Sequence, residues 1–146
     1  MNIFERLRSG IVSQSAEETQ TVAAQFGAAL PDNQILKLSG TLGAGKTTFI
    51  QGLAKGWGIT ESVKSPTFNL YSIYNGDRQL VHFDAYRLTD PSEAEDLLIE
   101  EFLTPPYCLA IEWPEKVDGW MDEDSWTLKF TIDSNDQHRI ELTSSC

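Results

Sequence analysis

The chain has 146 residues, 22 acidic and 11 basic, and its formal net charge at pH 7 is −11. This charge disfavours direct binding to nucleic acid, because an anionic surface repels a phosphate backbone. Forty per cent of the residues are hydrophobic, which suits one domain over residues 1–146, and no apolar run reaches the ~20 residues of a membrane span. The first residues, MNIFERLRSG, lack the apolar core of a signal peptide, so we expect a cytoplasmic protein.

The first part of the chain predicts two short strands that are each followed by a helix. Residues 9–14 can form the first strand. The S-A-E-E tetrapeptide at residues 15–18 matches a capping box, and the apolar spacing that follows predicts a helix over 16–30. An apolar strand over 35–38 then leads into a glycine-rich segment, after which a second helix is expected over 46–57.

The middle of the chain predicts a hairpin, a helix and a buried strand. Segments 70–74 and 79–83 flank an Asn-Gly dipeptide, which favours a tight hairpin turn. An Asp-Pro pair opens a helix over 91–102 that is acidic in its first turn. The apolar run at 107–111 is short enough for a strand that is buried on both faces. Cys108 lies in this run and is expected to be an unreactive buried thiol.

Two alternating segments, 126–132 and 138–142, predict a closing pair of antiparallel strands. Together with the earlier alternation of strands and helices, they indicate an α/β fold. We expect a single-domain P-loop NTPase, built as a three-layer sandwich around a mixed, mainly parallel sheet with a C-terminal antiparallel strand pair.

The glycine-rich segment, GTLGAGKT at residues 40–47, satisfies the phosphate-binding pattern G-x-x-x-x-G-K-[ST]. Glycines let successive backbone N–H groups turn toward a polyphosphate, and the following helix adds the positive end of its dipole. Lys46 adds a full charge for the β- and γ-phosphates, and the Thr47 hydroxyl is a hard ligand that suits Mg²⁺. We therefore expect ATP and Mg²⁺ to bind here, with nucleotide contacts from Gly40, Leu42, Gly43, Ala44, Gly45, Lys46, Thr47 and Thr48.

The metal also needs an acidic partner, which is expected at the carboxyl end of a neighbouring buried strand. Two residues qualify, Asp84 after QLVHF and Glu112 after YCLAI. Glu112 follows the more apolar strand and is the preferred magnesium-linked acid, together with Thr47. Asp84 is expected to orient water or polarise Thr47. The alternative for each acid is a solvated carboxylate at a strand end.

Four blocks of the sequence resemble a known family: LSGTLGAGKTTFIQGLAKGWG, VKSPTFNLYSIY, HFDAYRL and AIEWPE. Spread over about residues 15–126, they resemble the bacterial ATPases of tRNA threonylcarbamoyladenosine biosynthesis, the TsaE (YjeE) family. The resemblance implies an ATPase that is weak alone and works with the TsaB–TsaD complex. TsaD would transfer the threonylcarbamoyl group to N6 of adenosine 37 in tRNAs that read ANN codons. The tRNA would be contacted only through these partners, and self-association stays open.

The resemblance also assigns roles to single residues. Lys46 and Thr47 match the phosphate-loop lysine and the magnesium-binding threonine. Asp84 matches an acid that the family requires for activity, and Glu112 matches its second magnesium-linked acid, so Lys46, Asp84 and Glu112 form the expected catalytic set. His82 shares a strand face with Asp84 and is expected to be structural.

Further matches and two departures complete the resemblance. Ser65 and Thr67 fall in the family's switch-like Ser-Pro-Thr segment, which faces the γ-phosphate. Trp113 matches a tryptophan near the nucleotide, with core packing as the alternative. Thr41 stands where the family usually has aspartate, and the glycine expected near residues 98–99 is missing.

A small nucleotide or metabolite kinase is the main alternative function. Such a kinase needs an acceptor site and often an arginine-bearing lid, whereas this chain has few arginines and no long insertion after the phosphate loop. A GTPase is disfavoured because neither N-K-x-D nor D-x-x-G occurs. A nucleotide-gated interaction module with negligible hydrolysis overlaps with the ATPase interpretation.

Overall fold

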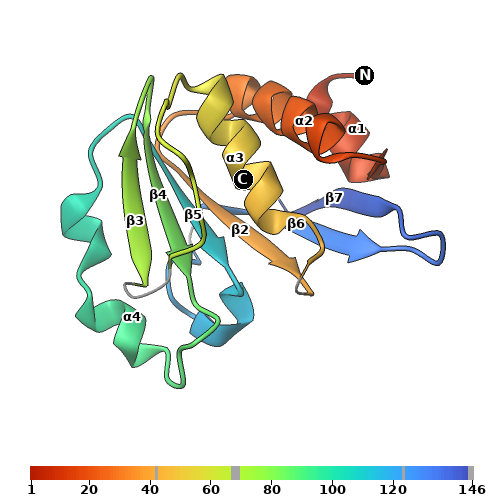
Figure 1. Ribbon diagram of the computed structural model, residues 1–146. Coiled ribbons are helices and arrows are strands. Elements are labelled where there is room, and N and C mark those ends of the chain that lie inside the picture. Colours follow the sequence, from red (N-terminus) through yellow and green to blue (C-terminus); the bar gives the residue numbers. More distant parts are fainter. Residues whose placement is uncertain (42, 67–69, 123, 145–146) are drawn as a thin grey trace.

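The computed structural model describes residues 1–41, 43–66, 70–122 and 124–144. In this part of the chain, seven strands form one sheet in the order β1-β7-β6-β2-β5-β4-β3 (Figure 1). The strands are β1 (Ile11–Ser13), β2 (Gln34–Gly40), β3 (Tyr71–Asn75), β4 (Gln79–Asp84), β5 (Tyr107–Glu112), β6 (Ser125–Ile132) and β7 (His138–Ser144).

The pairing of these strands confirms the predicted mixed sheet. β2 pairs in parallel with both β5 and β6, and β5 pairs in parallel with β4. β7 is antiparallel to β6 and to β1, so β1 shares the direction of the central strands, while β3 is antiparallel to β4. The sheet is therefore mainly parallel, with the predicted C-terminal antiparallel pair formed by β6 and β7.

Three helices cover one face of the sheet: α1 (Ile3–Ser9), α2 (Ala16–Ala29) and α3 (Lys46–Gly56) (Figure 1). α2 and α3 approach closely at Gly52, where an added Cβ would lie 2.6 Å from the Cα of Gln20. The core under these helices is rich in aromatic rings that contact one another edge-on or tilted, namely Phe4, Phe26, Phe49, Trp126 and Phe130.

α1 and the start of α2 show where the local sequence pattern does and does not predict the structure. Residues 1–8 carry no predicted element, yet α1 forms there and buries Leu7. The start of α2 is as predicted: the Ser15 side chain accepts a hydrogen bond from the Glu18 N–H at 3.1 Å. The reciprocal bond differs, because the Glu18 carboxylate accepts from the Gln14 N–H rather than from Ser15.

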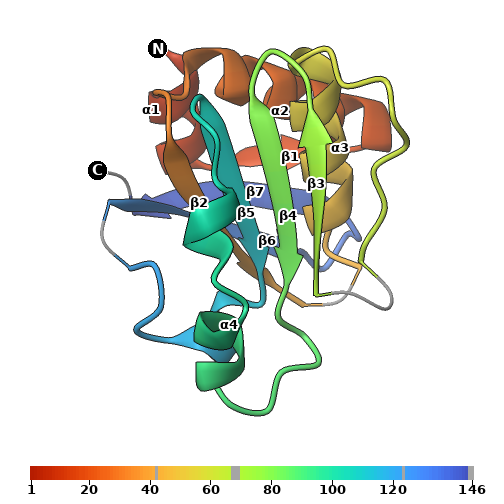
Figure 2. The same cartoon turned by 90° about the vertical axis from the view of Figure 1, so that its left-hand side faces the viewer.

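The opposite face is covered by short elements: α4 (Ser92–Asp96), η1 (Ile99–Phe102) and η2 (Pro114–Val117). Figure 2 shows α4 on the side of the sheet away from α2 and α3. The predicted continuous helix over 91–102 is wrong, because Leu98 adopts a left-handed conformation with φ 53° and separates α4 from η1. This break lets Ala94 and Ile99 both reach the second core, where they are fully buried.

The second core lies over β4 and β5, whereas the outer face of β6 and β7 is polar. Val81 and Phe83 of β4 and Leu109 and Ile111 of β5 point into this core. On β6 and β7 the residues that face the same way are half-buried or exposed and include Thr127, Lys129, Thr131, Arg139 and Glu141. Among the helices of the described segments, none has the length and apolar character that a membrane span requires.

Candidate nucleotide-binding site

The glycine-rich loop lies at the edge of the sheet where β2, β4 and β5 all end (Figure 1). It joins the end of β2 to the start of α3. Gly45, the N-cap of α3, has φ 105°, a conformation that side chains disfavour. At Gly40 an added Cβ would lie 2.4 Å from the Phe130 carbonyl oxygen, so only glycine fits. The loop geometry therefore accounts for these two glycines without reference to any ligand.

Lys46 is buried at the base of this loop, with 4% of its surface exposed. Its ammonium donates a hydrogen bond to the Gly40 carbonyl at 2.7 Å and lies 3.9 Å from the centre of the Trp113 ring. Burial lowers the pKa of Lys46, against the attraction of nearby carboxylates such as Glu112 and Asp84. Within the described residues its ammonium makes no ion pair, so a dipole and a ring face are its partners.

Thr47 links the loop to the end of β5. Its hydroxyl lies 3.3 Å from Glu112 Oε2, to which it donates, and 3.1 Å from the Ser65 hydroxyl. Glu112 is itself buried, and the same Oε2 lies 2.5 Å from His82 Nε2. A connected set of polar groups therefore runs from Ser65 through Thr47 and Glu112 to His82.

Asp84 lies beside Glu112, since the two residues are in register across the parallel pair β4 and β5. Its Oδ1 accepts a hydrogen bond from the Tyr86 N–H at 3.0 Å. Desolvation raises the pKa of Asp84, and the Glu112 charge acts in the same direction. The edge of the sheet therefore places two carboxyl groups together, of which Glu112 is the one that contacts Thr47.

Trp113 forms one wall of the site. It adopts a left-handed backbone conformation with φ 59° directly after β5. This turn places its ring against the Lys46 ammonium and 5.0 Å from the Tyr86 ring. A left-handed conformation in a bulky residue is costly, which points to a defined role for this ring.

These side chains surround a cavity of about 250 Å³, to which Tyr86 and His138 also contribute. The residues nominated by the sequence that line it are Gly43, Gly45, Lys46, Thr47, Thr48, Ser65, Asp84, Glu112 and Trp113. Gly40 lies behind it as the acceptor for Lys46, and Ala44 is buried in the loop. Leu42 and Thr67 were also nominated, but they lie outside the described residues.

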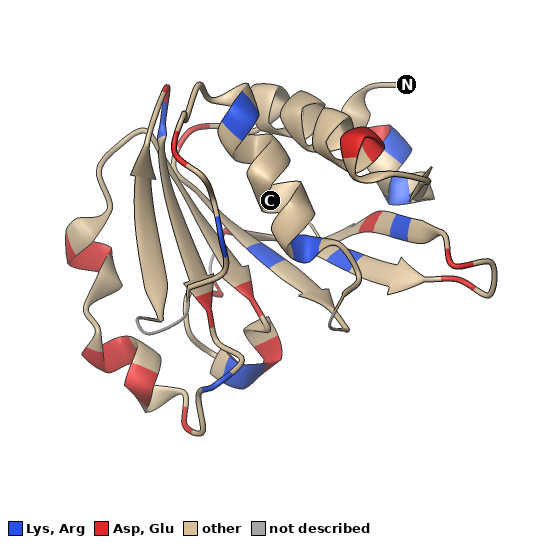
Figure 3. Ribbon diagram, viewed as in Figure 1, with Lys and Arg blue, Asp and Glu red and all other residues tan. Residues whose placement is uncertain are grey.

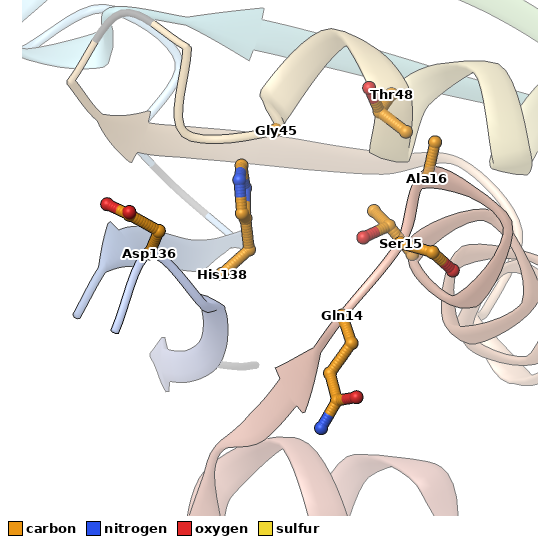
Figure 4. Close-up of a pocket in the computed structure, with 8 residues that line it drawn as sticks. Gln14, Ser15, Ala16, Gly45, Thr48, Asp136 and His138 are labelled. Atoms are coloured by element: carbon orange, nitrogen blue, oxygen red, sulfur yellow. The ribbon is translucent and has the colours of Figure 1, made fainter. Parts of the chain in front are cut away.

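A second cavity of about 260 Å³ adjoins the first. Figure 4 shows Ser15 and Ala16, at the start of α2, across this cavity from His138, with Gly45 and Thr48 along another side. Gly45, Thr48 and His138 line both cavities. The two hollows therefore meet at the start of α3.

His138 is a residue of this site that the sequence analysis does not nominate. Its Nδ1 lies 3.0 Å from the Ala44 carbonyl oxygen, and since a carbonyl only accepts, Nδ1 carries the proton. No local pattern around His138 indicates this contact, because it arises when β7 pairs with β6 and brings residues 94 positions apart together.

The charge of the protein is unevenly distributed. Figure 3 shows acidic residues concentrated on α4 and η1, while basic residues occur on β2, β6, β7 and at the start of α3. The acidic residues of the segment 90–102, which contains α4 and η1, are Asp90, Glu93, Glu95, Asp96, Glu100 and Glu101. Outside this segment, Asp84, Glu112 and Glu115 lie close enough to the Lys46 ammonium to attract it.

The polar groups around Thr47 fit a magnesium ion that is bound together with phosphate. Within the described segments, no group of three or more His, Cys, Asp or Glu side chains is arranged to hold a metal. The Thr47 hydroxyl and the Glu112 carboxylate are nevertheless neighbouring hard oxygen donors. Mg²⁺ is typically held by one or two such protein ligands, with substrate phosphates and water completing its shell.

Comparison with known proteins identifies the family. The model described as "Threonylcarbamoyl adenosine biosynthesis protein TsaE" matches residues 13–140. A relative from Treponema pallidum, named tRNA threonylcarbamoyladenosine biosynthesis protein TsaE, is 35% identical over 131 residues, which cover 90% of this chain and 97% of the relative. One of the same name from Rickettsia bellii is 41% identical over 143 residues, 97% of this chain and 99% of the relative.

A solved structure agrees with this result. The crystal structure of Bacillus subtilis YdiB superimposes with a TM-score of 0.77 at 30% identity, covering 94% of this chain and 85% of that one. The resemblance noted from four sequence blocks is thus confirmed over most of the chain. We conclude that the chain belongs to the TsaE family of threonylcarbamoyl adenosine biosynthesis proteins.

Proposed function

We propose that this chain is a Mg²⁺-dependent ATPase that acts with the TsaB–TsaD complex in the N6-threonylcarbamoylation of adenosine 37 in tRNAs reading ANN codons. Its ATP hydrolysis would sustain turnover of that complex. The observation that carries the enzymatic part is the meeting of the loop residues Lys46 and Thr47 with Glu112 at one edge of the sheet. The names of the relatives support the pathway, and the family resemblance supports the partners.

In this proposal the triphosphate occupies the cavity lined by Lys46, Thr47 and Glu112. Lys46 is well suited to it, because its ammonium has been taken out of water without gaining a carboxylate partner. On binding, the ammonium exchanges the Gly40 carbonyl for phosphate oxygens, which are stronger acceptors. The start of α3 adds its dipole and its free N–H groups.

The nucleoside occupies the adjoining cavity, between the start of α2 and His138. Support comes from the three residues that line both hollows, since a nucleotide must pass continuously from phosphate to sugar and base. Gln14 and Thr19 provide polar groups there, although the Thr19 hydroxyl is already bonded to Ser13 at 2.6 Å. The role of Thr19 is therefore mainly structural, at the wall of the cavity.

The acidic residues take different roles. Thr47 and Glu112 would hold the metal, directly or through water, because their oxygens are neighbours. A Mg²⁺ ion held there would screen the negative charge of the triphosphate from the carboxylates of Glu112 and Asp84. Asp84 is one strand away from Glu112 and orients the attacking water.

The remaining parts of the proposal concern the surroundings. The protein works in the cytoplasm and contacts tRNA only through TsaB and TsaD. Its net charge of −11 supports an indirect contact, because it opposes binding of a phosphate backbone.

The test is ATP hydrolysis by the purified protein, measured with and without TsaB and TsaD. We expect stimulation by both partners together, lost in Lys46→Ala and retained in Lys55→Ala, which removes an exposed lysine from the other end of the same helix. Transfer of the γ-phosphate to an added nucleoside monophosphate would instead establish the kinase alternative. Equal hydrolysis by both variants would refute the loop assignment.

A further inference from the structure

His82 is buried in the middle of the site without lining either cavity. It lies on β4, fully shielded from solvent, opposite Ala110 of β5. Alternation along the strand turns its ring toward α3, the face that also carries Leu80, while Val81 and Phe83 point the other way. Its ring reaches the carboxylate of Glu112 at the end of β5.

The contact with Glu112 is the shortest polar contact in this network. His82 Nε2 and Glu112 Oε2 are 2.5 Å apart, whereas the Thr47 hydroxyl lies 3.3 Å from the same oxygen. A carboxylate only accepts, so Nε2 carries a proton and donates it to the bond. Both contacts use Oε2, which fixes the carboxylate through one oxygen.

The other ring nitrogen argues against a purely structural role. His82 Nδ1 is buried and has no hydrogen-bond partner among the described residues. An unpaired buried polar atom costs stability, and a leucine would fill the same space without that cost. Such an exception is expected where the other nitrogen performs a function.

We infer that His82 is a positioning residue that holds Glu112 in the orientation needed beside Thr47. The inference rests on the proposed function, because it gives Glu112 its purpose as the magnesium-linked acid. Without the Nε2–H donor, the Glu112 side chain would keep, among the described residues, only the long hydrogen bond from Thr47, and it would gain rotational freedom. Outer contacts of this kind typically change metal affinity or activity by about 10–100-fold when removed.

The test compares two polar variants and an apolar one. Gln places an amide N–H close to where His82 Nε2 lies, whereas Asn is one carbon shorter and cannot reach Glu112. Leu fills the space without a donor. Leu80→Ala is the matched control, because it damages the same face of the same strand without touching Glu112.

The readout is equilibrium binding of a fluorescent ATP analogue, measured in EDTA and in Mg²⁺. We expect all variants to bind as wild type in EDTA. In Mg²⁺, His82→Leu and His82→Asn should lose about 10–100-fold of the gain in affinity, while His82→Gln and Leu80→Ala keep most of it. The Asn–Gln pair decides the question if the Leu variant does not fold.

A second measurement asks whether His82 acts through Glu112. In a Glu112→Gln background, His82→Asn should have no further effect on the Mg²⁺-dependent gain, and independent additive losses would overturn the inference. A wild-type gain in His82→Asn, or an equal loss in Leu80→Ala, would also overturn it. A wild-type protein that binds no ATP analogue would refute the proposed function itself, and this inference with it.

Discussion

Two buried lysines, one in β2 and one directly after the loop that follows it, differ in the partners of their ammonium groups. Lys37, in the middle of β2, is 9% exposed and pairs directly with Asp122. Lys46, which begins α3 after the same strand, is 4% exposed and instead contacts the Gly40 carbonyl and the Trp113 ring. The charge of Lys37 is neutralised by Asp122, whereas Lys46 has no carboxylate in an ion pair with it among the described residues.

The pKa directions reflect this difference. The hydrogen bond from Lys37 holds the pKa of Asp122 below its usual value. Burial lowers the pKa of Lys46, and the attraction of Glu112, Glu115 and Asp84 offsets the lost water only in part. Under the proposed function, the Lys46 ammonium would gain its counter-charge from the triphosphate.

The largest expected effect separates the two lysines by function. Lys46→Met should reduce ATP turnover by about 10²–10³-fold, the usual loss when one preorganised electrostatic contact to a reacting group is removed. Lys37→Met should leave turnover within about twofold, because its side chain faces the other side of the sheet. Steady-state hydrolysis measures both, and a large loss in Lys37→Met would break the comparison.

A smaller effect separates the partners of the ion pair. Asp122→Asn should lower the free energy of unfolding by about 1–3 kcal/mol, because it leaves the Lys37 ammonium buried without its counter-charge. Lys37→Met should cost less, since Asp122 is half-exposed and can be solvated by water. Urea unfolding gives the values, with Asp118→Asn as an exposed-acid control from the same region. Equal losses in all three variants would contradict the prediction.

Replacing Lys46 by Met should raise the stability of the nucleotide-free protein, although it lowers ATP turnover. The folded protein holds the Lys46 proton less tightly than the unfolded chain, so wild-type stability rises with pH through the lowered pKa. Nucleotide-free Lys46→Met should therefore be the more stable protein at neutral pH. The difference should close as the pH passes the ordinary lysine value of 10.5. Thermal unfolding at several pH values tests this, and a less stable variant at pH 7 would show that Lys46 supports the fold.

The smallest effect concerns Asp84, which also carries a charge that burial disfavours. Its raised pKa means that the folded protein binds this proton more tightly, so stability falls as the pH rises from 3.8 through the raised value. Asp84→Asn should match wild type at acid pH and be slightly more stable above that window. The same thermal scans detect it, and no difference at any pH would mean that Asp84 is solvated.

Prediction from sequence succeeded for contacts that are close along the chain. The glycine-rich loop between a strand and a helix was recognisable because its motif is contiguous in residues 40–47, and the hairpin because its Asn-Gly turn is local. It failed where a tertiary contact overrides a local preference. The helix expected over 91–102 breaks at Leu98 so that Ala94 and Ile99 can both enter the second core.

The candidate site shows the same division. Asp84 and Glu112 were both recognisable as acids at strand ends, but the preference for Glu112 rested on an apolar run and on the family resemblance. The structure adds a geometric reason, because the Glu112 carboxylate is the one that lies beside Thr47. Strand parity placed His82 on the face of Asp84, although its partner across the sheet proved to be Glu112.

The sequence by itself therefore determined the mixed α/β architecture, the family and the loop residues, since periodicity, turn chemistry and short motifs act over a few residues. Only the tertiary structure decided that His82 contacts Glu112, that His138 contacts the loop from 94 residues away, and that Lys37 has a carboxylate partner while Lys46 has none among the described residues. The physical reason is that strand order and register, which local pattern does not specify, set the distances at which buried charges and hydrogen-bond donors interact.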